Sequence, residues 1–267
     1  MIYFVATPIG NLKDITLRAL ETLRAVDVIF CEDTRHSLKL LNAYEIKKPL
    51  YPCHKFNERE AALKILAAHK EGKEIAVISD AGMPVISDPG NTVCKVLTEE
   101  GAPFTVIPGA NAALSALVLS ALPADRFAFI GFLPDKAGEK KRLLEKYKNL
   151  DITTVFHVAP QDVDRDISAV YAVFGERRAC AVREITKMHE EAVRFNLSQG
   201  LQGEKRGEYV LLVEGASGEN ELNALTEKEH LLHYISGGMD KKDAVKQVAK
   251  DRGVPKSEIY KIALDID

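Results

Sequence analysis

The sequence has few cysteines, no long apolar run and no strong excess of either charge. Its four cysteines lie far apart without a CxxC pair, which argues against a zinc site or a disulfide scaffold and suits a reducing compartment. The most apolar helical stretch, residues 112–122, is much shorter than a membrane span, and the first residues carry no basic segment of the signal-peptide type. The net charge of −3 predicts no general attraction to phosphate or membranes. We therefore expect a cytoplasmic protein with no membrane partner.

Two common nucleotide motifs are also missing. No GxxxxGK[ST] pattern occurs, and no GxGxxG follows the first predicted strand, residues 2–6. These absences argue against a P-loop phosphate cradle and against a nicotinamide enzyme that transfers hydride. At the same place TPIG, residues 7–10, offers one glycine and one proline, which let the backbone approach a flat ligand.

Strands and helices alternate along the chain. Short apolar runs predict strands at 2–6, 28–31, 75–78 and 104–107, with segments of helical spacing between them. This order favours a mostly parallel sheet that is covered on both faces. Further apolar runs predict a second, smaller sheet from residues 127–134, 153–158, 179–183 and 208–214.

The expected fold is therefore α/β, with domains at 1–122 and 123–218 and a helical tail at 219–267. In the tail, two predicted helices flank Gly253 with the spacing of a helix-turn-helix. Its basic residues exceed its acidic ones only weakly, so a structural helical hairpin is as good an interpretation as an RNA contact. A second basic run, 136–148, is expected to be the solvated face of a helix.

Polar segments recur where predicted strands end. They are TPIGN (7–11), EDTRH (32–36), CHKFNE (53–58), SDAGMP (79–84) and PGAN (108–111). Each alone is compatible with an ordinary turn, but parallel strands bring their carboxyl ends to one sheet edge, where α/β proteins bind ligands. Five polar loops on one edge favour a binding site. Nearby, Asn57 and Glu60 form a capping-box pattern, and Asp88 is expected to cap the helix that follows it.

Several segments, in order, carry a resemblance to a known family. The chain resembles the tetrapyrrole-methylase-type (class III) S-adenosylmethionine methyltransferases, and within them the ribosomal RNA small subunit methyltransferase I family, in VATPIGNLKDITLRAL, CEDTRH, HKFNERE, ISDAGMPVISDPG, FAFIGFLPDK, REITKMHEE and GEYVLLVEG. The resemblance runs nearly end to end. It implies two α/β domains of tetrapyrrole-methylase type with the donor cleft between them, S-adenosylmethionine as donor, no metal, and a homodimer. The implied reaction is 2′-O-methylation of a cytidine in 16S rRNA, in the small ribosomal subunit.

The resemblance also implies which residues hold the donor. They are Pro8, Ile9, Gly10, Ser79, Asp80, Ala81, Gly82, Met83, Asn111 and Ala112 from the first domain, and Val158, Arg183, Glu208 and Tyr209 from the second. Carboxylates and backbone carbonyls can meet the sulfonium cation and the amine, and glycines let the main chain come close.

The remaining polar loops are expected to face the substrate. The candidate catalytic residues are Glu32, Asp33, Arg35, His54, Asn57, Glu58, Arg183, Glu184 and Lys187, with the last three opposite residues 32–35. A ribose hydroxyl is a poor nucleophile, so transfer needs in-line placement and a base, for which Glu32, Asp33, His54 and Glu184 are candidates. The alternative for these acids is a surface ion pair, Glu32 with Arg35 or Glu184 with Lys187. His157 and His189 are expected to be packing or surface histidines.

The chain departs from the family pattern at three places. Met83 stands where threonine is usual, Ala110-Asn111 replace Pro-Ser or Pro-Cys, and His157-Val158 with Gln161-Asp162 replace Tyr-Glu and His-Arg. Two rival functions stay open: a small-molecule methylase of the tetrapyrrole type, which shares the fold, and a ribosome-assembly factor that binds the donor without turnover, which the departures near Val158 keep open. The tail, which a tetrapyrrole would not need, argues against the first.

Overall fold

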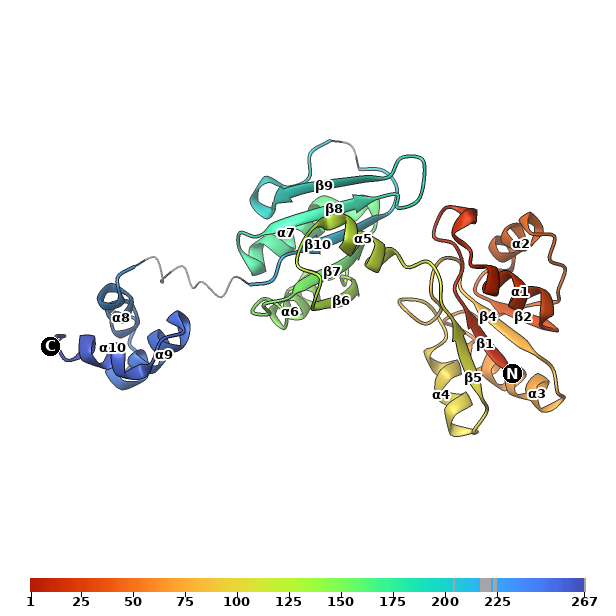
Figure 1. The fold of residues 1–267 in the computed structure, drawn as a ribbon, viewed down its shortest axis with the longest axis horizontal. Helices are drawn as coiled ribbons and strands as arrows, with labels where there is room; N and C mark the ends of the chain where they lie inside the picture. Colours follow the sequence, from red (N-terminus) through yellow and green to blue (C-terminus); the bar gives the residue numbers. More distant parts are fainter. Residues whose placement is uncertain (204, 217–221, 223–224, 267) are drawn as a thin grey trace. The chain divides into compact units, whose positions relative to one another are not determined.

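The computed structural model describes residues 1–203, 205–216, 222 and 225–266 (Figure 1). They form two compact units. One comprises Met1–Lys148 and Ile152–Glu214, and the other comprises Asn149–Asp151 and Gly215–Asp267. The predicted boundary at residue 218 lies outside the described residues, and the domain limits stay a prediction.

The first sheet has five strands, and all of its pairings are parallel. In spatial order they are β3 (Leu50–Pro52), β2 (Val28–Cys31), β4 (Ile75–Ile78), β1 (Ile2–Val5) and β5 (Phe104–Ile107). The nearly continuous apolar runs of β1, β2 and β4 are buried, as strands covered on both faces must be. The predicted strands are confirmed, and β3 was missed because it is a short edge strand that ends in proline.

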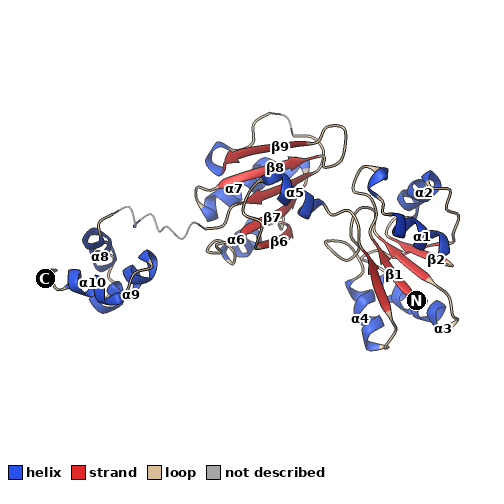
Figure 2. Ribbon diagram, viewed as in Figure 1, coloured by secondary structure: helices blue, strands red, loops and turns tan. Residues whose placement is uncertain are grey.

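Helices cover both faces of this sheet (Figures 1 and 2). On one face, Phe4 and Val77 pack against α3 (Glu58–Lys70) and α4 (Asn91–Glu99). On the other, Val5 and Ile29 pack against α1 (Leu17–Ala25) and α2 (Thr34–Ala43). Successive strand residues point to opposite faces, so one apolar run supplies both cores. The carboxyl ends of the strands are left at one edge, and all five predicted polar loops follow these ends.

The second sheet is mixed, with β6 parallel to β7 and its other pairings antiparallel. Its order is β6 (Phe127–Phe132), β7 (Thr153–Val158), β10 (Tyr209–Val213), β8 (Arg178–Arg183) and β9 (Glu191–Asn196). One face packs on α5 (Ala112–Ser120), and the other on α6 (Ala137–Glu145) and α7 (Val163–Phe174). Helix α5 thus precedes the predicted boundary at residue 122 yet packs on the second sheet. The α/β class expected from the sequence is confirmed.

The basic run 136–148 is not wholly solvated. The Lys140 side chain is only 3% exposed, and its ammonium donates to the carboxylate of Asp166, which is also buried. The expectation of a solvated helix face therefore fails at this position, where α6 lies against α7.

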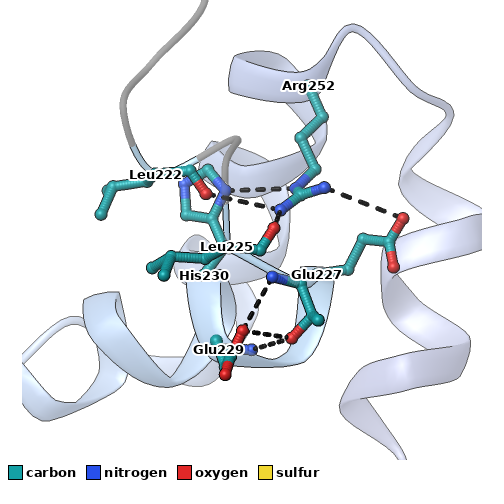
Figure 3. A network of polar contacts seen from close by, with 7 residues as sticks. Leu222, Leu225, Glu227, Glu229, His230 and Arg252 are labelled. Atoms are coloured by element: carbon teal, nitrogen blue, oxygen red, sulfur yellow. Dashed lines mark hydrogen bonds and ion pairs between the residues drawn. The ribbon is translucent and has the colours of Figure 1, made fainter.

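The second unit contains α8 (Glu227–Ser236), α9 (Lys241–Arg252) and α10 (Lys256–Ala263), packed around a small apolar core. Gly253 adopts a left-handed conformation and ends α9, as predicted. Figure 3 shows the polar network beside it, in which Arg252 donates to the carbonyls of Leu222 and Leu225 and, over 3.2 Å, to Nδ1 of His230. In the part of the chain described, no helix is both long and apolar enough to span a membrane.

Candidate functional site

The loops after β1 and β4 are joined by a small antiparallel bridge. The Thr7 N–H donates to the Gly82 carbonyl over 2.9 Å, and the Gly82 N–H donates back over 3.1 Å. Gly82 has φ +79°, and a Cβ there would lie 3.2 Å from Cγ2 of Ile9. Glycine therefore lets the two loops meet and fixes where Ile9 and Met83 lie.

These loops border a cavity of about 460 Å³ that residues of both sheets line. Nine of the predicted donor-binding residues line it, namely Ile9, Ala81, Gly82, Met83, Asn111, Ala112, Val158, Glu208 and Tyr209. Pro8, Gly10, Ser79, Asp80 and Arg183 are not among the residues that line it. The structure thus brings together most of a set that is widely separated in the sequence.

The walls of the cavity are mainly apolar and aromatic. His157 lines it and lies between Phe129 and Phe132, with ring centroids 5.1 and 5.4 Å away. Burial lowers the pKa of His157, so the ring is neutral at neutral pH. From its sequence, His157 is expected to be an ordinary packing or surface histidine, and neither phenylalanine is predicted to have a role in the site. The sequence shows only that His157 and the two phenylalanines lie in adjacent predicted strands, and this does not indicate that their side chains line a cavity.

Asn111 has a definite structural task at the edge of the cavity. Its side-chain oxygen accepts from the Leu114 N–H over 2.9 Å and caps α5. The first two residues of that helix, Ala112 and Ala113, line the cavity. The amide that replaces the usual residue of the family pattern therefore holds the amino end of α5 in place.

Three carboxylates gather at the ends of β2 and β4. Burial raises the pKa of Glu32, and the charges of Asp80 and Asp88 raise it further. Burial likewise raises the pKa of Asp88, which lines the cavity. The expectation that Asp88 caps the following helix is wrong, because Gly90 is the N-cap residue of α4 and no side chain caps that helix.

Asp33 differs from its neighbour Glu32 in every contact. Its carboxylate accepts from the Arg35 guanidinium, with atoms 2.7 and 3.1 Å apart, and from the Arg35 N–H at 2.8 Å. These bonds hold the pKa of Asp33 far below its usual range. The surface pair expected between Glu32 and Arg35 is thus formed by Asp33 instead. The Asp33 N–H donates to Asp80 over 3.1 Å, which links the loops after β2 and β4.

The loop after β3 is folded by Asn57. The Asn57 side chain accepts from the His54 N–H over 2.7 Å and donates to the Pro52 carbonyl over 3.1 Å. It precedes α3 as predicted but makes no capping bond, so the capping-box expectation is wrong. Glu58 accepts from the Thr92 N–H over 2.9 Å and ties α3 to α4. Asn57 and Glu58 thus have structural partners in the described residues.

His54 and Phe56 project from that same loop. The His54 and Phe56 rings are 6.1 Å apart, and Phe56 is 84% exposed. The Lys55 ammonium lies 4.8 Å from the Phe56 ring centroid. His54 interacts electrostatically with Glu32, so this loop lies near that carboxylate.

Lys187 ties the second-sheet loop to the loop after β1. Its ammonium lies 2.9 Å from both the Glu184 and the Glu208 carboxylates. A Cβ at Gly10 would lie 2.6 Å from Cγ of Lys187, so the lysine stem occupies that space. The Glu208 N–H and Lys187 hold the pKa of Glu184 below its usual range. The expected pair of Glu184 with Lys187 is confirmed.

The predicted position of this loop opposite residues 32–35 stays a prediction. In the described residues, its polar contacts with the first sheet reach the loop after β1, where the Thr186 hydroxyl donates to Asp14. Arg183 pairs with Glu191 over 3.0 Å, and its Nε is buried without a hydrogen-bond partner in the described chain. A search of the described residues for groups of side chains that could hold a metal ion found none.

Comparison with known proteins gives consistent results. The family model of Tetrapyrrole (Corrin/Porphyrin) Methylases matches residues 1–200. The chain is 43% identical over 270 residues to Ribosomal RNA small subunit methyltransferase I of Bacillus subtilis, which covers 97% of this chain and 92% of that protein. A protein of the same name from Thermotoga maritima is 41% identical over 215 residues. The match covers 79% of this chain and 96% of that protein, so about a fifth of this chain is not matched there.

Solved structures of low sequence identity share the fold. Uroporphyrin-III C-methyl transferase from Thermus thermophilus, solved in complex with S-adenyl homocysteine, matches with a TM-score of 0.56 and 18% identity. The match covers 80% of this chain and 96% of that one. At such identity the likeness establishes the architecture of the two sheets.

Proposed function

Since the chain belongs to the ribosomal RNA small subunit methyltransferase I family of tetrapyrrole methylases, as its segments predicted, we propose that it methylates 16S rRNA with S-adenosylmethionine as donor. The acceptor in this proposal is the 2′-hydroxyl of a cytidine ribose. The observation that carries it is the cavity, which gathers most of the residues expected to hold the donor from two separate sheets.

The chemistry of the cavity suits S-adenosylmethionine. A volume of about 460 Å³ lies within the range of small-molecule sites, and its apolar walls can enclose an adenosine. Asp88 and Glu208 offer carboxylates to positive groups, and the free N–H groups at the amino end of α5 favour a carboxylate. When bound, the donor supplies a methyl group on a positively charged sulfonium.

Glu32 is the candidate base that the environment favours. A carboxylate of raised pKa accepts a proton more readily, and burial and two neighbouring acids raise that of Glu32. The hydrogen bonds of Asp33 and Glu184 stabilise their ionised forms and make them weaker bases. We therefore propose that Glu32 is the general base that accepts the proton of the ribose hydroxyl. The exposed Arg35 and Lys55 beside it can hold a ribose phosphate.

The proposal includes a homodimer. Edge strand β5 exposes Phe104 and Val106, and α5 exposes Leu114 and Val118, the last at 80%. A second copy would remove these apolar side chains from water. Sedimentation of the purified protein tests this part, with a dimer expected and a monomer at micromolar concentration against it.

The reaction is tested on small ribosomal subunits from cells that lack the protein. The purified protein and labelled S-adenosylmethionine should place label in 16S rRNA, in a dinucleotide that resists alkali because its 2′-oxygen is blocked. Label in an alkali-sensitive mononucleotide would mean base methylation and refute the 2′-O assignment. Binding of the donor without transfer would favour the assembly-factor alternative, and mass spectrometry of cellular 16S rRNA should show the loss of one 2′-O-methylcytidine.

A further inference from the structure

The second unit carries a groove between α9 and α10 of about 500 Å³. The residues that line it are Lys242, Val245, Lys246, Lys256, Ser257, Tyr260 and Lys261. The match to the tetrapyrrole methylase model ends at residue 200, so the groove lies outside the part of the chain that defines the fold.

The two helices present the groove on a packed support. Val248 and Ala249 of α9 and Ile259 and Ala263 of α10 are buried in one core. Lysines four residues apart on α9, and lysines in the first two turns of α10, then flank the groove on both sides. The left-handed Gly253 sets the short turn that brings these two faces together.

Four lysines line the groove, and the surface that they and their neighbours present inside it is almost wholly apolar, as expected where lysine stems face a groove. Residues 225–266 contain eight lysines and arginines against seven acids, yet every charged residue that lines the groove is a lysine. Lys246 has an exposed partner in Asp243 at 2.7 Å, and such pairs are worth little in water. Within the described residues, Lys242, Lys256 and Lys261 have no ion pair. This arrangement favours a polyanion.

Tyr260 adds an aromatic surface among these cations. Its side chain is 59% exposed and lies beside Val245 in the groove. An exposed aromatic ring flanked by cations is the combination that proteins use to stack a nucleobase while lysines meet its phosphates.

We propose that this groove binds a single-stranded segment of RNA, with phosphates on the four lysines and a base stacked on Tyr260. The inference rests on the proposed function, because the RNA would be the 16S rRNA of the subunit that the enzyme modifies. The groove supplies affinity and register and takes no part in the chemistry.

The test compares two double variants of the full chain that lose equal charge. Lys256→Gln with Lys261→Gln removes groove lysines, and Lys228→Gln with Lys250→Gln removes exposed lysines of the same unit outside the groove. Affinity for small ribosomal subunits and for a single-stranded 16S rRNA fragment is measured between 50 and 200 mM salt. The groove variant should bind about tenfold more weakly, and its slope of log affinity against log salt should fall by about 1.4, since each phosphate contact contributes about 0.7. Tyr260→Ala should weaken binding by about tenfold while Tyr260→Phe keeps it.

The proposal is overturned if the two double variants bind with equal affinity. It is also overturned if the groove variant binds subunits more weakly but shows the parental salt slope and binds the RNA fragment as the parent does, because that result indicates a protein partner. Methyl transfer is recorded in the same samples, and donor affinity should be parental in all of them. If even the parent transfers no methyl group, the proposed function fails, while the comparison of the variants still decides whether the groove binds RNA.

Discussion

Replacing Glu32 by glutamine should lower turnover and stabilise the fold at the same time. The folded protein raises the pKa of this carboxyl above the ordinary 4.5, because the side chain is partly buried and faces Asp80 and Asp88. A raised folded-state pKa gives stability that is fully present below the unfolded value and is lost as pH rises through the folded one. At neutral pH the ionised Glu32 therefore destabilises the fold, and the neutral amide removes that cost.

The loss of activity should be much larger than any change in binding. General base catalysis contributes about 10²- to 10⁴-fold, which corresponds to about 3–5 kcal/mol in the barrier. Single-turnover transfer to subunits should slow by that factor, while calorimetry shows parental affinity for S-adenosylmethionine. The parent's rate should rise with pH through the raised pKa of Glu32, and this dependence should vanish in the variant.

Asp33→Asn is the matched control, because it removes one carboxylate from the next position. Asparagine can still cap α2, and the lost pair with Arg35 is solvent-exposed, so the melting temperature should stay close to that of the parent. Turnover should fall by less than tenfold. If Glu32→Gln melts below the parent, or if it transfers methyl groups at the parental rate, the assignment of Glu32 as the base is wrong.

Three further changes test other parts of the structure. Lys140→Met should lower the free energy of unfolding in urea by up to about 3–5 kcal/mol, because the buried Asp166 then keeps only the half-exposed Arg165 as partner, 3.7 Å away, and Asp166→Leu in the same chain should restore most of it. Gly109→Ala should weaken S-adenosylmethionine binding by calorimetry and cost about 1–3 kcal/mol of stability, because the new methyl group would lie 2.9 Å from Cβ of Ala6 and push the loops after β1 and β5 apart. Burial and Arg252 lower the pKa of His230 below its ordinary 6.5, so the second unit should lose melting temperature as pH falls below that value, and a His230→Gln variant should lose less.

Strands β1, β2 and β4 of the first sheet could be predicted because they are buried on both faces. In the sequence such strands are short apolar runs, and a polar loop begins where each run ends. Strand β3 escaped because Leu50–Pro52 is short and partly exposed. Strand β9 was also missed, since its residues alternate between half-buried and exposed with no apolar run. Edge strands β5 and β6 could still be predicted because their residues form apolar runs, so local pattern reveals an edge strand only where such a run is present.

The side-chain partners in the site were harder to predict than the loops that hold them. Glu32 and Asp33 are adjacent acids with the same nearby arginine, and the sequence gives no reason to pair one and bury the other. The choice follows from the strand end, where Glu32 faces Asp80 and the Asp33 carboxylate turns to the first N–H groups of α2. In the same way Asp88 has the sequence position of a helix cap, but Gly90 takes that place and leaves the carboxyl at the cavity.

The three departures from the family pattern all fall on the wall of one cavity. Met83, Asn111, His157 and Val158 line it. The first three of these residues have a local physical account. Asn111 caps α5, the half-buried His157 packs between two phenylalanines, and Met83 replaces a hydroxyl with a flexible apolar side chain. The changes at Met83 and His157 place packing side chains in the wall, while the change at Asn111 supplies a helix cap. A cavity altered in this way keeps its enclosing shape and its two carboxylates, so the departures bear on how the donor is held more than on whether it can be held.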